Sequence, residues 1–133
     1  MAIVFTNTGR TLSASYTVGK TTTTENLILR LYSNDYTPNP DSESLNFTEV
    51  TSGGGYLSYV LNGEDWSISD GAATYPQQQW LFVASKGNIY GYYVTLDTGE
   101  VIFAERFSNG PFNIASNGDI IRVNINFTLG QNS

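Results

Sequence analysis

The sequence has 133 residues, of which 14% are charged and 14% aromatic, and its formal net charge is −6. This acidic balance disfavours binding to nucleic acid or to an anionic membrane surface, because both partners require clustered Lys and Arg. The chain contains no His and no Cys, which excludes a Ser-His-Asp triad, cysteine nucleophiles, disulfides and imidazole or thiolate metal sites. The composition predicts a folded domain that works without a cofactor.

Apolar residues alternate with polar ones along most of the chain, and this period of two predicts β-strands. The expected strands span residues 2–6, 13–18, 26–33, 56–61, 66–69, 78–85, 89–96 and 100–107, followed by the C-terminal run 118–130. In that run Ile121, Val123, Ile125, Phe127 and Leu129 share one face and polar residues the other, which is typical of an antiparallel sheet. No stretch of ten or more residues combines helical periodicity with caps, so no helix is expected.

Turn-forming residues separate these strands. Asp97-Thr98-Gly99 predicts a three-residue hairpin loop, and Asn62-Gly63 predicts a second hairpin between the strands on either side of it. Eight or nine short strands at this spacing predict an all-β fold, a single-domain antiparallel β-sandwich or jelly roll over residues 1–133. Residues 1–25 are expected to form an extended N-terminal arm or edge strands, with residues 19–25 as the connection.

The longest irregular stretch, residues 34–49, is acidic and contains two prolines. Loops of this length are uncommon in compact domains and tend to be functional or mobile. Residues 39–43 carry oxygen ligands at alternate positions, as a cation-binding loop does, but the Gly that an EF-hand turn needs is missing. A solvated acidic loop is the favoured interpretation, and whether it binds a cation stays open.

The carboxylates show no arrangement typical of acid–base catalysis. Glu64 and Asp65 are neighbours in a turn, while Glu100 and Glu105 lie five residues apart on one strand and therefore point to opposite faces. Since His is also absent, no catalytic residue is assigned, and the protein is expected not to be an enzyme.

The aromatic residues allow two interpretations. Trp66 and Trp80 are expected in the core, although the surplus of tyrosines is large enough to build a carbohydrate-binding platform. Tyr90 and Tyr92 are expected to share one strand face and Tyr93 the other. Because Tyr and Arg are enriched at protein interfaces, the candidate interface residues are Tyr90, Tyr92, Tyr93 and Arg106.

Several segments resemble small virion proteins of tailed bacteriophages. They are Ile89 to Thr95, Ala104 to Phe107, Asn117 to Ile120 and Asn26 to Asn34. The resemblance implies a capsid decoration (cement) protein, typically a homotrimer, whose partner is the major capsid protein on the outside of the shell. The first ten residues show no basic segment followed by an apolar one, so no Sec signal is expected. Assembly in a bacterial cytoplasm is therefore expected.

A second functional hypothesis belongs to a different class. The surplus of aromatic residues and the acidic stretch 34–49 are also compatible with a carbohydrate- or receptor-binding β-domain of a phage tail or fibre. The two hypotheses differ in where the aromatic side chains must lie, since a sugar-binding platform has to expose them.

Overall fold

The fold was examined in a computed structural model that describes residues 3–20 and 26–128. Within these residues the chain forms ten strands and one α-helix, with two short 3-10 turns. The elements are β1 (Val4–Phe5), α1 (Asn7–Thr17), β2 (Leu27–Tyr32), β3 (Tyr59–Leu61), β4 (Ser67–Ser69), β5 (Ala72–Leu81), β6 (Gly87–Ile89), β7 (Gly91–Thr95), β8 (Val101–Arg106), β9 (Phe112–Ile114) and β10 (Ile120–Thr128). The prediction of an antiparallel all-β fold is confirmed; its finer assignment to a sandwich or jelly roll stays a prediction.

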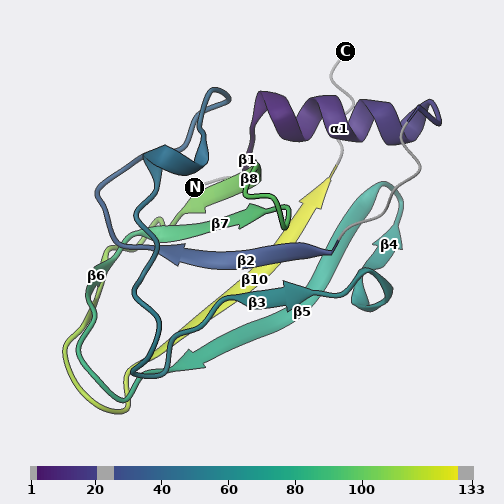
Figure 1. The fold of residues 1–133 in the computed structure, drawn as a ribbon. Helices are drawn as coiled ribbons and strands as arrows, with labels where there is room; N and C mark the ends of the chain where they lie inside the picture. Colours follow the sequence, from purple (N-terminus) through teal and green to yellow (C-terminus); the bar gives the residue numbers. More distant parts are fainter. Residues whose placement is uncertain (1–2, 21–25, 129–133) are drawn as a thin grey trace.

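The strands form two larger sheets and one small one (Figure 1). The order in the five-stranded sheet is β1-β8-β7-β2-β3, and the order in the three-stranded sheet is β10-β5-β4. β6 and β9 form a separate pair, and every pairing is antiparallel. No helix in the described part of the chain is long and apolar enough to cross a membrane.

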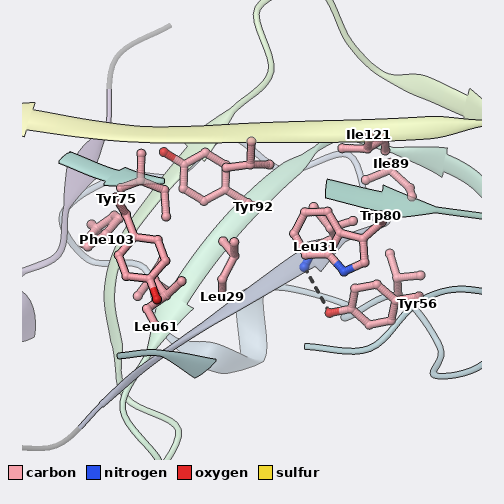
Figure 2. Close-up of a cluster of buried hydrophobic side chains, with 14 of the residues drawn as sticks. Leu29, Leu31, Tyr56, Leu61, Tyr75, Trp80, Ile89, Tyr92, Phe103 and Ile121 are labelled. Carbon is pink, nitrogen blue, oxygen red and sulfur yellow. Dashed lines mark hydrogen bonds between the residues drawn. The ribbon is translucent and has the colours of Figure 1, made fainter. Parts of the chain in front are cut away.

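The main core is formed by side chains from both larger sheets (Figure 2). Leu29 and Leu31 of β2 and Phe103 of β8 contribute to the same cluster as Trp80 of β5 and Ile121 of β10. Their burial follows from the alternation of apolar residues along each strand, which directs one row of side chains inward. Both larger sheets therefore contribute apolar side chains to one shared core.

The C-terminal strand and the hairpin were predicted correctly. Along β10, Ile121, Val123 and Ile125 are buried, whereas the polar residues between them are exposed; Leu129, expected on the same face, lies outside the described residues. β7 pairs with β8 across the predicted loop. Gly99 in that loop has a φ of 101°, a conformation that a side chain would disfavour.

The predicted strand 13–18 and the expectation of no helix are wrong, because residues 13–17 belong to α1 and Val18 is its C-cap. The side chain of Thr6 caps this helix by accepting a hydrogen bond from the Gly9 amide, and its hydroxyl donates to the Val101 carbonyl on β8. Gly9 lies so close to the Ile102 carbonyl that a Cβ would collide with it. The helix therefore depends on contacts with a distant strand. Residues 1–25 were expected to form an arm or edge strands, and within the described part of this segment β1 is the one strand that forms. Residues 21–25, most of the expected connection, lie outside the described residues.

The predicted hairpin at Asn62-Gly63 is also wrong. β3 pairs with β2, β4 pairs with β5, and Gly63–Asp65 forms a 3-10 turn, so the chain crosses here from one sheet to the other. The strand expected at 78–85 begins earlier, at Ala72, and contains Pro76. Between Val123 and Ile125 the register shifts so that β5 carries an extra residue near Pro76. A proline has no N–H to donate, and a bulge is where a sheet tolerates one.

We expect the protein to lose stability above pH 10 because burial raises the pKa of several tyrosines. The pKa of Tyr93 rises to about 12, and those of Tyr32, Tyr56 and Tyr92 rise further above their ordinary value of 10. The folded state holds these phenolic protons more tightly than the unfolded chain. The stabilisation that they contribute is therefore complete below pH 10 and is lost as the pH rises through 12.

A spectrophotometric tyrosinate titration combined with circular dichroism checks this expectation. Ionisation of the buried tyrosines should coincide with unfolding, whereas urea-unfolded protein should titrate entirely near pH 10. Complete titration of the folded protein near pH 10 with an unchanged circular dichroism spectrum would contradict it.

Candidate functional site

The four residues predicted to form an interface do not lie together on the surface. Tyr92 is 2% exposed and Tyr93 is 5% exposed, whereas Tyr90 and Arg106 are half-buried. β7 lies between β8 and β2 in the five-stranded sheet, and both faces of the strand are covered. Tyr92 points into the main core, while Tyr93 belongs to a second cluster with Tyr32 and other residues. This corrects the expectation that Tyr92 and Tyr93 present an interface and leaves Tyr90 and Arg106 within reach of a partner.

Tyr90 and Tyr92 also differ from the prediction in their orientation. A half-buried Tyr90 packs against the second cluster, whereas Tyr92 lies in the main core, so the two do not share a face. The cause is an interruption of the predicted strand 89–96, since β6 ends at Ile89 and β7 begins at Gly91. At Gly91 a Cβ would collide with the Glu105 carbonyl and the Tyr32 ring.

Residues 34–49 cover the second face of the five-stranded sheet. Phe47 is buried and stacks on Tyr93 with ring centroids 4.4 Å apart, and Tyr36 packs edge-on against Phe47. Asn34 fixes the segment by donating to the Asn46 carbonyl and accepting from the Thr48 amide. The stretch expected to be a functional or mobile loop is therefore a packed covering layer, and its apolar residues are the sequence signal of that role.

Arg106 and Glu49 make polar contacts that attach this layer to the sheet. Arg106 forms an ion pair with Asp35 at 2.7 Å, and its guanidinium lies over the Tyr90 ring, 5.2 Å from the centroid. Glu49 accepts from Arg30 at 3.0 Å and from the hydroxyl of buried Tyr56 at 2.7 Å. Asp35 is largely exposed, so its ion pair adds little stability. The half-buried Glu49 network satisfies groups that would otherwise lose hydrogen bonds on burial.

The hollows of the described surface contain few charged side chains, and one of about 180 Å³ is lined by Glu43 and Glu100. A groove of about 710 Å³ lies along α1 and β1, and among the described residues that line it Arg10 alone is charged. A smaller one, of about 380 Å³, contains Glu105 and Arg122, and Glu105 accepts a hydrogen bond from the Tyr92 hydroxyl. No group of three or more carboxylates that could hold a metal ion occurs among residues 3–20 and 26–128.

The outer face of the three-stranded sheet is polar and nearly uncharged. Arg122 is the single charged residue in β4, β5 and β10, and its guanidinium donates to the Gln79 side chain. The next pair along the sheet is Gln77 with Asn124, which are also hydrogen bonded. We call this surface the amide face and define it by Gln77, Gln79, Asn124 and Asn126.

At one end the amide face becomes apolar. Leu81 is 53% exposed and lies directly opposite Ile120, which is 40% exposed, and Val83 follows two residues after Leu81 with 57% exposure. We call these three residues the aliphatic patch. The aliphatic patch was not predicted from the sequence. Residues 80–83 are all apolar, however, and such an unbroken run indicates that some apolar side chains lie on the outer face of the strand. The pairing of Leu81 with Ile120, in contrast, joins segments 39 positions apart in the chain and carries no local signal.

The aromatic side chains are mostly internal. Trp80 is fully buried as predicted, and Trp66 is half-buried against the core. Among the described residues, the large hydrophobic side chains classed as exposed are mainly aliphatic, and only Tyr16 and Phe112 among them are aromatic. The aromatic surplus therefore serves packing, and the exposed apolar surface of the described residues is mainly aliphatic.

No protein-family model, curated protein or solved structure matches this chain. Inference about function must therefore start from the surface chemistry of the described residues. That chemistry consists of the aliphatic patch, the amide face and a surface of low charge density.

Proposed function

We propose that this chain is a non-enzymatic structural protein of a virion, a capsid decoration protein that binds and stabilises the major-capsid lattice as a homo-oligomer. The observation that supports the proposal most is the aliphatic patch on a rigid sheet. Leu81 and Ile120 lie opposite each other at the end of the sheet, and Val83 follows just beyond it. Exposed apolar side chains that gather in one place are typical of a contact with another protein. The resemblance of the sequence to small virion proteins points to the capsid as that protein.

The distribution of side chains supports a role in binding more than one in chemistry. A decoration protein needs a stable body and a surface that can be desolvated at low cost. The amide face meets the second need because uncharged groups lose less on desolvation than ions do. Many copies bound to one shell would also make a modest affinity per copy sufficient for durable attachment.

The placement of the aromatic residues favours a protein partner over a sugar. A carbohydrate platform requires exposed rings, whereas Tyr56, Tyr75, Tyr92 and Trp80 are buried. A glycan array probed with the purified protein distinguishes the two partners, and specific glycan binding that depends on an exposed ring would contradict the proposal.

Replacing Leu81 and Ile120 with Ser should abolish or strongly weaken binding to capsids. These side chains are half exposed in the free protein, so the double substitution should cost little stability while removing apolar area from the contact. Co-sedimentation with capsids assembled from the major capsid protein of the same genome measures the effect. Ile68→Ser is the matched control, because Ile68 is exposed on β4 at the opposite end of the sheet.

Two results would overturn the proposal. One is the absence of wild-type binding to such capsids together with the absence of the protein from intact virions analysed by mass spectrometry. The other is equal loss of binding in the double variant and in Ile68→Ser, which would mean that the patch has no special part in the contact.

A further inference from the structure

Among residues 3–20 and 26–128, the outer edge of β10 is the longest strand edge without a paired strand. Within the described residues β10 pairs only with β5, and it has nine residues. The other terminal strands are short, with two residues in β1, three in β3 and three in β4. A free edge exposes unpaired N–H and C=O groups, and short edge strands are one common protection against unwanted pairing. β10 lacks that protection.

Three other common protections, namely Pro, a bulge and a charge directed at the edge, are also missing from β10. The strand contains neither Pro nor Gly, and its strict alternation of buried and exposed residues shows that it is not bulged. The extra residue of the register shift lies on β5 instead, near Pro76. Its one charge, on Arg122, is held over the molecule's own sheet by the hydrogen bond to Gln79. Glu105 of β8 lines the hollows beside Arg122, Asn124 and Asn126. A long, regular and nearly uncharged edge is suited to pairing with another strand.

We propose that β10 pairs antiparallel with β10 of a second copy of this chain, about a two-fold axis at Asn124. This register pairs all nine residues and joins the two three-stranded sheets into one continuous sheet. On the inner face Val123 meets Ile125 of the second copy, which extends the apolar layer. On the outer face Arg122 meets Asn126 of the second copy.

The pairing of all nine residues selects this register, and the charge of the strand agrees with it and with a second copy as the occupant. An axis at Arg122 would place two guanidinium groups directly opposite each other, and like charges in that position destabilise a sheet. An axis at Asn124 avoids the conflict. The same chain thus supplies an edge of equal length with no opposed charges, and the two-fold operation is the commonest symmetry of homo-oligomers.

The inference rests on the self-association in the proposed function and not on capsid binding. The proposed dimer differs from the trimer that the sequence resemblance implies, so the mass of the free protein in solution distinguishes the dimer from the trimer. In the paired form both aliphatic patches lie on the same face of the joint sheet. Two patches on one face would allow a bivalent contact with a repeating lattice.

Asn124→Lys tests the pairing. The substitution places two ammonium groups opposite each other at the axis, and we expect the dissociation constant of the dimer to rise about tenfold or more. Gln77→Lys is the matched control, because Gln77 is exposed on the same face beside Asn124 but one strand further from the edge. Analytical ultracentrifugation of the full chain should give twice 14.6 kDa for wild type and for the control.

Asn126 tests the register. Asn126→Glu should tighten the dimer because the introduced carboxylate lies opposite Arg122 of the second copy, and Asn126→Lys should weaken it. If only general repulsion between two copies of net charge −6 mattered, Asn126→Glu would weaken the dimer and Asn126→Lys would tighten it. The gain from Asn126→Glu should shrink at high salt.

Three results would overturn the inference. They are a strictly monomeric wild type, a trimer that Asn124→Lys leaves intact, and equal effects of Asn124→Lys and Gln77→Lys. If circular dichroism shows that the Asn124→Lys variant is unfolded, the opposite effects of Asn126→Glu and Asn126→Lys on dimer affinity still test the pairing. Capsid co-sedimentation is measured separately, so a chain that dimerises without binding capsids contradicts only the proposed function.

Discussion

Replacing Trp80 with Ala is expected to lower the free energy of unfolding by about 3–5 kcal/mol, the largest effect of a single truncation in this protein. Trp80 is fully buried and is the largest side chain of the main core. Its ring stacks on Tyr59 with centroids 4.8 Å apart and lies 6.1 Å from the Tyr56 ring. Truncation removes these contacts and leaves a cavity that surrounding β-strands can fill only in part.

Most of this cost comes from packing. The indole Nε1 donates to the Leu57 carbonyl at 2.8 Å, and Leu57 itself is exposed, so water can replace that donor when the indole is lost. Urea unfolding followed by circular dichroism measures the change, with an unchanged m-value as the sign of a comparable unfolded state. Trp66→Ala is the matched control, since Trp66 is only half-buried, and it should cost about 1–2 kcal/mol. Similar losses for both variants would contradict the assignment of Trp80 to the centre of the core.

The features that the sequence predicted correctly are those encoded by neighbouring residues. The alternation in β10 and the Asp97-Thr98-Gly99 loop each need only a short window, because strand periodicity and turn conformation are local properties. α1 lacks such a signal. Its cap, Thr6, also bonds to Val101, and its Gly9 fits against Ile102, so two contacts with β8 stabilise a segment whose composition favours a strand.

The interface prediction failed for a related reason. Period two shows that Tyr92 and Tyr93 face opposite sides, but it does not show whether each side is covered. The cover over Tyr93 comes from Phe47, 46 positions earlier in the chain, and the cover over Tyr92 comes from the other sheet. A continuous apolar run is the local sign that a strand is buried on both faces. Tyr92-Tyr93-Val94 is such a run, and so is Val101 to Ala104 on the strand paired with it, so this signal was present in the sequence and was missed.

Replacing Gly55 with Ala is expected to destabilise the protein by about 2–5 kcal/mol, through two separate causes. Gly55 has a φ of 98°, a conformation that costs an L-residue about 1–2 kcal/mol. A Cβ there would also collide with the Leu81 carbonyl and approach the backbone of Phe82. Backbone atoms cannot move aside as a flexible side chain can, and such overpacking adds about 1–3 kcal/mol.

Gly53→Ala separates these two causes. Gly53 lies in the same loop with a φ of 100°, but a Cβ at this position meets nothing within 4 Å. It should therefore show the conformational cost alone, about 1–2 kcal/mol in thermal or urea unfolding. Because the collision at Gly55 involves Leu81, Gly55→Ala should also displace the aliphatic patch and weaken capsid binding at temperatures where the variant remains folded. Equal stability of the two variants would mean that the loop does not approach β5 as closely as the structure has it, and the patch would then not depend on this glycine.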